Sequence, residues 1–281
     1  MAMDRRAFLL GTGALGLAAC AAPERDLLET YEGVDIELQP GVTTAPGSGI
    51  EAIPDVTTPT NAISPMQALR DSIEPAEDRL GASFVARARG EQVTVEEVAG
   101  DGVAKWTFAN PVASGDNLLF LVDDYDGVDH YRVLLPTRPN GSFGWIHKDQ
   151  VDLLRHNFAI RVELDEFRLT VFDHDQVVFD TTVGVARDNA PTPLGRYYTT
   201  EIIRPIQSDS VYGAFAYGLS GFSETFVTFS GGPGQLGIHG TNDPDTLGTN
   251  VSSGCIRMHN DDITKLVEEL KVTAGVPVEV L

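Results

Sequence analysis

Residues 237–260 read G-I-H-G-T-N-D-P-D-T-L-G-T-N-V-S-S-G-C-I-R-M-H-N, and they contain His239 followed sixteen residues later by Cys255. A free thiol has a pKa of about 8.5 and is only slightly ionised at neutral pH, and a neighbouring imidazole lowers that pKa and stabilises the thiolate. The connection is long enough to place the two residues on adjacent strands of one sheet. The stretch therefore predicts a Cys–His pair for nucleophilic catalysis. The competing interpretation is that Cys255 is an inert core residue.

The neighbours of Cys255 suit attack on a carbonyl group. Gly254 has no side chain, so a substrate carbonyl can approach the backbone closely, and the backbone N–H groups around Cys255 are placed to stabilise an oxyanion. Arg257 alternates with Cys255 along a strand, which directs both side chains to one face of the sheet. Arg257 is expected to pair with a substrate carboxylate or with the thiolate, and a purely structural ion pair is the alternative.

Around this motif, the sequence predicts a mainly β unit over residues 156–281. Alternating patterns predict three adjoining strands, at 158–164, 167–173 and 176–185. His174 is expected at a hairpin tip. Asn260 is expected to cap a helix over 261–270. The apolar face of that helix is expected to consist of Ile263, Leu266, Val267 and Leu270.

Two further regions precede this unit. Residues 79–155 alternate short β-prone runs with turn signals and end in F-G-W-I-H-K-D-Q-V, which predicts a small β domain with a positioning role. His130 and His147 lie here and are expected to be surface or packing residues. Residues 20–75 carry seven prolines and little periodic apolar patterning, so we expect a tether, with a short helix at 66–70.

Residues 1–19 have the features of an export signal. Arg5 and Arg6 precede an uncharged run that is shorter than the roughly 20 residues needed to span a bilayer. D-R-R-A-F-L-L resembles a twin-arginine (Tat) signal, and L-A-A-C resembles a bacterial lipobox. The lipobox resemblance implies cleavage before Cys20, a lipid on its sulfur, and anchoring on the outer side of the cytoplasmic membrane, in the periplasm or in the cell wall. With Cys20 lipidated, we expect no disulfide to Cys255.

Composition excludes several classes of partner. The chain has 20 Lys and Arg against 41 Asp and Glu, a net charge of −21, so nucleic acid is not expected as a partner. One Cys and one His do not make a zinc site. Asp243, Asp245 and Asp261 lack the bidentate glutamate of a calcium loop. We therefore expect no metal and no cofactor.

The motif resembles the catalytic domain of the L,D-transpeptidase (YkuD-like) family. That family carries a histidine in H-G-[T/S] and later [S/T]-H-G-C followed by an apolar residue. Here I-H-G-T and S-S-G-C-I-R fit, as does P-T-P-L-G-R-Y-Y upstream, and the resemblance covers roughly residues 158–281. The end of region 79–155 resembles the last turn of a bacterial SH3-like domain. Together these resemblances imply a small SH3-like barrel followed by a β-rich catalytic domain with a short C-terminal helix, over residues 156–281.

The family resemblance also assigns roles to residues. It implies that Cys255 is the nucleophile and His239 its base, with the Gly240 carbonyl orienting the second imidazole nitrogen. Oxyanion and substrate contacts are implied for Ser253, Gly254, Arg257, Gly240 and Thr241. Ser253 stands where the family pattern has a histidine, which bears on rate or substrate preference. His259 is expected to be structural.

The implied substrate is the peptidoglycan stem peptide, and the protein is expected to act as a monomer. Attack on the third stem residue would release D-alanine and form a thioester, which the amine of a second stem would resolve into a 3→3 cross-link. With water as acceptor the same site would be an L,D-carboxypeptidase. A non-catalytic wall-binding envelope lipoprotein is a further alternative. A papain-like peptidase or amidase is disfavoured, because there the nucleophile normally precedes the histidine in the chain.

Overall fold

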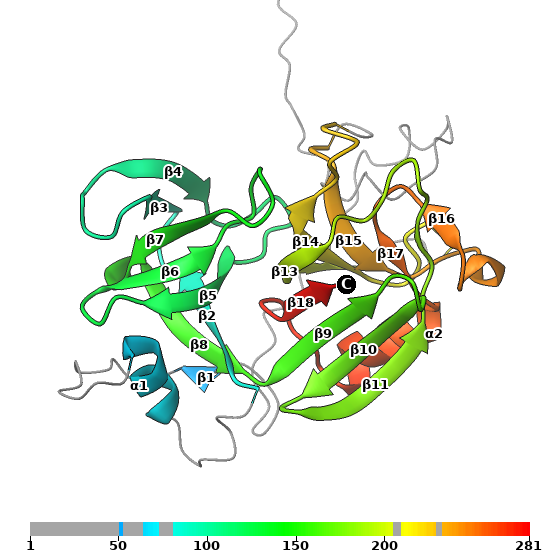
Figure 1. Cartoon of the computed structure of the whole chain (residues 1–281), viewed down its shortest axis with the longest axis horizontal. Coiled ribbons are helices and arrows are strands. Elements are labelled where there is room, and N and C mark those ends of the chain that lie inside the picture. The colour runs from blue at the N-terminus through cyan, green and yellow to red at the C-terminus, as the bar shows by residue number, and fades with distance from the viewer. Residues whose placement is uncertain (1–50, 53–63, 73–80, 205–208, 229–231) are drawn as a thin grey trace, which may run out of the picture.

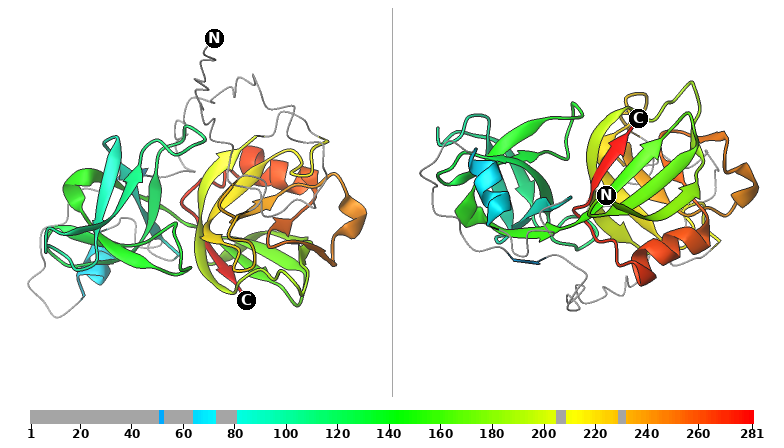
Figure 2. Two further views of the ribbon diagram at one scale, coloured as in Figure 1. Left: turned by 90° about the horizontal axis from the view of Figure 1, so that it is seen from above. Right: turned by 60° about the horizontal axis from the view of Figure 1, so that its bottom comes forward.

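The computed structural model describes residues 51–52, 64–72, 81–204, 209–228 and 232–281. The predicted signal, Cys20 and most of the predicted tether lie outside the described residues. Within the described ranges the chain is mainly β, as predicted, and forms two eight-stranded sheets and one two-stranded sheet. Figures 1 and 2 show the two large sheets side by side.

The first sheet has the strand order β1-β8-β2-β5-β6-β7-β3-β4, and all its pairs are antiparallel. Its strands are β1 Glu51–Ala52, β2 Ser83–Ala88, β3 Gln92–Glu96, β4 Ala104–Ala109, β5 Leu119–Tyr125, β6 His130–Leu134, β7 Phe143–His147 and β8 Val151–His156. The 3₁₀ turn Lys148–Gln150 joins β7 to β8. Phe84, Phe120 and Ile146 are fully buried between the strands. The short strands expected over 79–155 are present, and the SH3-like assignment stays a prediction.

Part of the predicted tether is packed against this sheet. The short helix α1 spans Pro65–Asp71, with Ser64 as its N-cap and proline in its first turn. Met66 and Leu69 are buried in the core of the first sheet. The backbone of β1 pairs with β8. The segments 51–52 and 64–72 thus belong structurally to the first sheet, in contrast to the expectation of a loose tether up to residue 75.

The second sheet has the strand order β11-β10-β9-β18-β13-β14-β15-β17. Its strands are β9 Phe158–Glu163, β10 Arg168–Asp173, β11 Gln176–Thr182, β13 Gly195–Ile203, β14 Ala216–Phe222, β15 Gln235–His239, β17 Ile256–Arg257 and β18 Pro277–Val280. The parallel pairs are β9 with β18 and β15 with β17, and the separate strands β12 Val185–Ala186 and β16 Asn250–Ser252 are also parallel. The predicted hairpin β10–β11 is present, and His174 takes the left-handed conformation at its tip.

Near the C-terminus, a helical segment packs against the second sheet. It consists of α2 Asn260–Thr264 and a π-helical turn Lys265–Glu269, and the 3₁₀ turn Pro244–Thr246 lies earlier in the chain. Its predicted apolar face is confirmed, because Ile263 and Leu266 are fully buried in the core and Val267 and Leu270 pack against it. The predicted N-cap is wrong by one residue. His259 occupies that position without a side-chain cap, and Asn260 uses its side chain elsewhere.

The two large sheets are in direct contact. The Tyr198 hydroxyl of β13 is buried and donates to the Leu119 carbonyl of β5 at 2.9 Å. Leu121 and Leu134 of the first sheet pack with Tyr198, and the His156 Nε2 lies 3.0 Å from the Gly275 carbonyl. None of the helices in the described ranges combines the length and apolarity that crossing a bilayer requires.

Candidate active site

His239 and Cys255 lie at the ends of two adjacent parallel strands, because His239 ends β15 and Cys255 directly precedes β17. His239 is the last residue of β15 and is in register with Arg257 of β17, and Ile238 is in register with Ile256. Neighbouring strands lie about 4.8 Å apart, so if Cys255 continues the line of β17 its Cα is about 8 Å from that of His239. Register partners face the same side of a sheet, so Arg257 and His239 share one face, and the alternation of side chains along β17 assigns Cys255 to that face as well. Both Cys255 and His239 are fully buried.

The imidazole of His239 is held in a defined tautomer. Its Nδ1 lies 2.6 Å from the Gly240 carbonyl, which can only accept, so Nδ1 carries the proton. The Nε2 is then the basic nitrogen, and it has no hydrogen-bond partner among the described residues. The Tyr212 ring packs edge-on against the imidazole with a centroid distance of 5.1 Å. This is the orientation that a general base requires.

The imidazole is neutral in this environment. Burial, together with the nearby Arg257 cation, lowers the pKa of His239 to about 3, although the hydrogen bond to Gly240 opposes the shift. No proton therefore occupies Nε2 at neutral pH.

The turn that follows His239 is fixed by Asn260. The Asn260 Oδ1 accepts hydrogen bonds from the backbone N–H groups of Thr241 at 3.1 Å and Ala214 at 3.2 Å. Gly213 and Gly240 allow this approach, because a Cβ on either residue would overlap the Asn260 Oδ1. Thr241 itself is buried, and its Oγ1 accepts from the Asp243 N–H at 3.1 Å.

The backbone before Cys255 is held from both sides. The Thr192 Oγ1 donates to the Gly254 carbonyl at 2.9 Å, and the Gly254 N–H donates to the Ser252 Oγ at 3.2 Å. The Ser252 hydroxyl also donates to the Cys255 carbonyl. Gly254 adopts φ +131°, a conformation that L side chains rarely take. In this arrangement the Gly254 N–H is engaged with Ser252, in contrast to the expectation that it faces the substrate.

Cys255 is in a disulfide bond in this structure, so the prediction of no disulfide is wrong. That prediction rested on lipidation of Cys20, the only other cysteine in the sequence, which lies outside the described residues. Chemistry at Cys255 therefore requires the reduced thiol, since only a thiolate is nucleophilic.

Two arginines, Arg257 and Arg187, lie close together near the end of β17. The backbone of Arg257 is fixed by reciprocal hydrogen bonds with Gly184 at 2.7 and 2.8 Å. Burial lowers the pKa of the Arg257 guanidinium, as does the nearby Arg187 cation, while Asp243 and Tyr212 raise it. Arg187 is exposed, and Ser253 is half-buried. Arg257 and the Arg187 cation near it are two positive charges that could bind a carboxylate.

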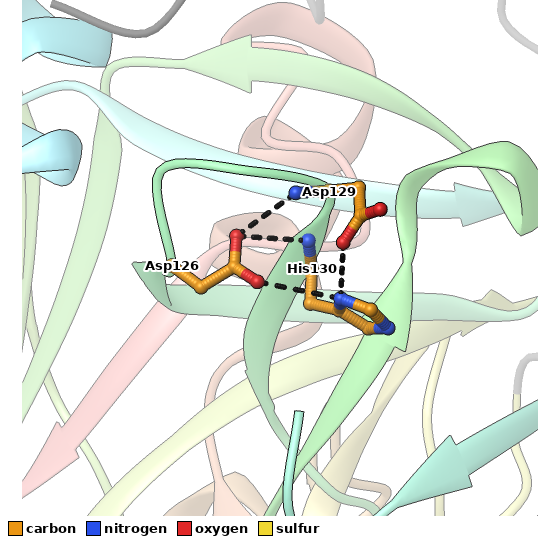
Figure 3. Close-up of side chains that lie close together, drawn as sticks. All are labelled: Asp126, Asp129 and His130. Atoms are coloured by element: carbon orange, nitrogen blue, oxygen red, sulfur yellow. Dashed lines mark hydrogen bonds and ion pairs between the residues drawn. The ribbon is translucent and has the colours of Figure 1, made fainter. Parts of the chain in front are cut away.

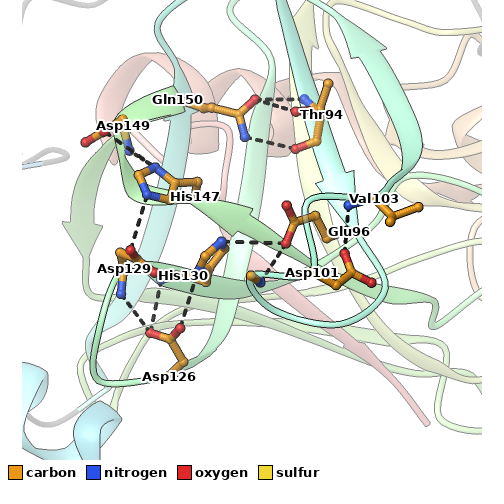
Figure 4. Close-up of polar contacts among 11 residues, drawn as sticks. Thr94, Glu96, Asp101, Val103, Asp126, Asp129, His130, His147, Asp149 and Gln150 are labelled. Carbon is orange, nitrogen blue, oxygen red and sulfur yellow. Dashed lines mark hydrogen bonds and ion pairs between the residues drawn. The ribbon is translucent and has the colours of Figure 1, made fainter.

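A second cluster of titratable side chains lies in the first sheet, away from Cys255. The Nδ1 of buried His130 lies 2.6 Å from an Asp129 oxygen and 3.3 Å from an Asp126 oxygen, as Figure 3 shows. Figure 4 extends this network, because the Nε2 of His147 lies 3.4 Å from Asp129 and the Nε2 of His130 lies 3.6 Å from Glu96. Asp126, Asp129 and His130 are within reach of one metal ion. Their mutual contacts also account for the cluster without an ion, and Asp129 is about one-third exposed, so we assign it no ligand.

The sequence predicts a site at Cys255, His239 and Arg257, and that assignment stays a prediction. It does not indicate the side chains that hold these residues in the structure. Thr192 lies in the P-T-P-L-G-R-Y-Y segment, whose only signal is its resemblance to the family, and the position of Asn260 predicts a helix cap. Arg187 and Tyr212 carry no local signal, because their relation to the site depends on the packing of distant segments.

Comparison with known proteins finds similarity in the second part of the chain. Residues 157–280 match the family model described as the L,D-transpeptidase catalytic domain (YkuD). This range contains both β15 and β17 with the Cys–His pair, and it excludes the first sheet.

Among curated proteins, the putative L,D-transpeptidase YkuD of Bacillus licheniformis is 31% identical over 109 residues, covering 39% of this chain and 58% of that protein. The Bacillus subtilis YkuD is 32% identical over the same shares. The chain thus spans 58% of the length of these relatives. Among solved structures, L,D-transpeptidase 3 from Mycobacterium tuberculosis with a faropenem-derived adduct has 17% identity and a TM-score of 0.37, covering 51% of this chain and 75% of that one.

Proposed function

We propose that the chain is a cysteine-dependent L,D-transpeptidase that acts on peptidoglycan stem peptides. The observation that carries the proposal is the state and position of the His239 imidazole. The ring is neutral, and its Nε2 has no hydrogen-bond partner among the described residues. His239 ends β15, and Cys255 precedes β17, the strand that pairs with β15. The match of residues 157–280 to the catalytic-domain model supports the same reaction class. Residues 1–20 support export and lipid anchoring at Cys20 as part of the proposal. A lipid on the Cys20 sulfur excludes a disulfide at that residue, so the proposed lipidated protein carries Cys255 as a free thiol.

The first half-reaction forms an acyl-enzyme. In the reduced protein, His239 Nε2 takes the proton of the Cys255 thiol, and the thiolate attacks the carbonyl carbon of the third stem residue. The C–N bond to D-alanine breaks, the leaving amine receives the proton from His239, and a thioester remains on Cys255. Arg187 and Arg257 are suited to bind a substrate carboxylate during this step.

The second half-reaction regenerates the thiol. An amine of a second stem attacks the thioester carbonyl, gives a proton to His239, and forms the 3→3 amide bond. The proton returns from His239 to the departing Cys255 sulfur. Water in place of the amine would give the free tripeptide by the same path.

The low pKa of His239 is compatible with this role. With Cys255 in a disulfide, no thiolate faces the imidazole, so burial and the Arg257 cation dominate its pKa. Reduction creates an ionisable partner on the same face of the sheet, and its negative charge raises the pKa of the imidazole. The pair then shares one proton, as a nucleophile and its base must.

The test is incubation of the reduced full chain with a purified tetrapeptide-bearing muropeptide, followed by mass spectrometry of protein and products. We expect D-alanine release, a thioester adduct on Cys255 and a cross-linked dimer. Cys255→Ser should abolish all three while leaving the circular dichroism spectrum and Tm unchanged. Cys20→Ser, which changes the other cysteine, is the matched control and should keep the activity. A tripeptide without dimer identifies a carboxypeptidase, and absence of both products refutes the proposal.

A further inference from the structure

The loop between β6 and β7 of the first sheet reaches across to the catalytic unit. Arg138 in this loop donates through Nη1 to the Pro233 carbonyl at 2.8 Å and through Nη2 to the carbonyls of Ser223 at 3.0 Å and Phe226 at 3.2 Å. Its guanidinium also stacks over the Phe222 ring, 4.7 Å from the centroid. One side chain thus binds both sides of the connection between β14 and β15.

Asn140 in the same loop holds the start of that connection. Its Nδ2 donates to the Phe222 carbonyl at 2.8 Å, and its Oδ1 accepts from the Phe222 N–H at 2.8 Å. The amide therefore pairs with Phe222 as the backbone of a neighbouring strand residue would. Such a reciprocal pair fixes the direction in which the chain leaves β14.

Ser223, in the connection held in this way, lies beside Gly254, the residue before Cys255. Ser223 is fully buried, its N–H donates to the Gly234 carbonyl at 2.8 Å, and its Oγ accepts from the Phe226 N–H at 3.1 Å. A Cβ on Gly254 would lie 3.9 Å from the Ser223 Cβ and 2.9 Å from the Leu236 Cδ2. Leu236 and Ser223 therefore border the side of Gly254 on which a side chain would stand, and the space between them fits only a glycine.

We infer that Arg138 and Asn140 are positioning residues for the reaction at Cys255, acting through Ser223 and Gly254. This inference rests on the proposed function. In this inference the first sheet contributes to catalysis by fixing the β14–β15 connection, so that Ser223 stays beside Gly254 and Cys255 keeps its position. Cys255 is connected to Gly254 by one peptide bond, so a displaced connection shifts the sulfur relative to His239. Displacements of about 1 Å cost up to about 100-fold in rate.

A second contact between the sheets provides a matched control. Arg196 of β13 forms an ion pair with Asp123 of β5 at 2.7 Å, and no hydrogen bond or ion pair described for it involves the 222–234 connection. Arg196→Ala removes an arginine contact between the same two sheets. A residue that merely joins the sheets should behave as Arg196 does, whereas a positioning residue should alter turnover.

The experiment measures steady-state D-alanine release by reduced wild type, Arg138→Ala, Arg138→Lys, Asn140→Ala and Arg196→Ala. Arg138→Ala and Asn140→Ala should lower kcat about tenfold or more with KM changed less than about twofold, as expected for a misplaced nucleophile. Arg138→Lys should recover part of the loss, since an ammonium reaches fewer carbonyls than the guanidinium fork. Arg196→Ala should keep the wild-type kcat.

Hydrogen exchange supplies a readout that does not depend on turnover. In Arg138→Ala the amides of Ser223, Phe226 and Gly254 should exchange faster than in wild type, and in Arg196→Ala they should not. Unchanged exchange at these amides overturns the inference, as does faster exchange with a wild-type kcat. If the wild type releases no D-alanine, the proposed function fails, and the exchange data alone decide whether Arg138 positions Gly254.

Discussion

Removing the side chain of Asn260 should destabilise the protein and displace His239. Asn260→Ala leaves the backbone N–H groups of Thr241 and Ala214 without their acceptor. An unsatisfied buried polar group costs about 1–3 kcal/mol, and the Ala214 region is partly accessible to water, so we expect a total loss of about 2–4 kcal/mol. The loss of the anchor also frees the Gly240 carbonyl that holds the His239 Nδ1, so kcat should fall as well.

The assay is urea unfolding followed by circular dichroism, with D-alanine release measured on the same preparations. Asn260→Asp is the matched control, since its carboxylate keeps an acceptor for both N–H groups and should retain most of the stability. Gly240→Ala places a Cβ on the Asn260 Oδ1, so its cost should be smaller in the Asn260→Ala background than in wild type. A free energy of unfolding for Asn260→Ala within about 0.5 kcal/mol of wild type would refute the assigned role.

Three further outcomes are expected. Burial lowers the pKa of His156 from 6.5 to about 4, so the folded protein binds this proton less readily than the unfolded chain. The neutral His156 therefore contributes about 3 kcal/mol to the free energy of unfolding above pH 6.5, and this contribution is lost as the pH falls toward 4. His156→Gln should flatten the pH dependence of urea unfolding over that window, and an unchanged slope contradicts this. Tyr198→Phe should cost about 1–2 kcal/mol in urea unfolding, because the buried Leu119 carbonyl loses its donor, and no cost would mean that water replaces it. Thr192→Val keeps the side-chain shape but removes the donor to the Gly254 carbonyl, so kcat should fall. Thr181→Val, at a half-buried hydroxyl of the edge strand β11 that donates to Asp262, should leave kcat unchanged.

The local pattern of the sequence determined most of the secondary structure. Strands β9, β10 and β11 follow the alternation of apolar and polar residues, and the helical segment after His259 follows the spacing of Ile263 and Leu266. The spacing of His239 and Cys255 also predicted their placement on adjacent strands, because one short crossover leads from β15 to β17. These features depend on neighbours within a few residues or on one connection.

Only the tertiary structure decided what holds the candidate site. Thr192 binds Gly254 across 62 residues of sequence, and Arg138 binds Ser223 across 85. A hydrogen bond from a side chain to a remote carbonyl produces no periodic pattern and does not depend on the adjacent residues, so it cannot be predicted from the sequence. Asn260 is the clearest example, because its side chain is equally suited to cap a helix. In the structure Gly213 and Gly240 pack against its Oδ1, which therefore accepts from the N–H groups of Ala214 and Thr241.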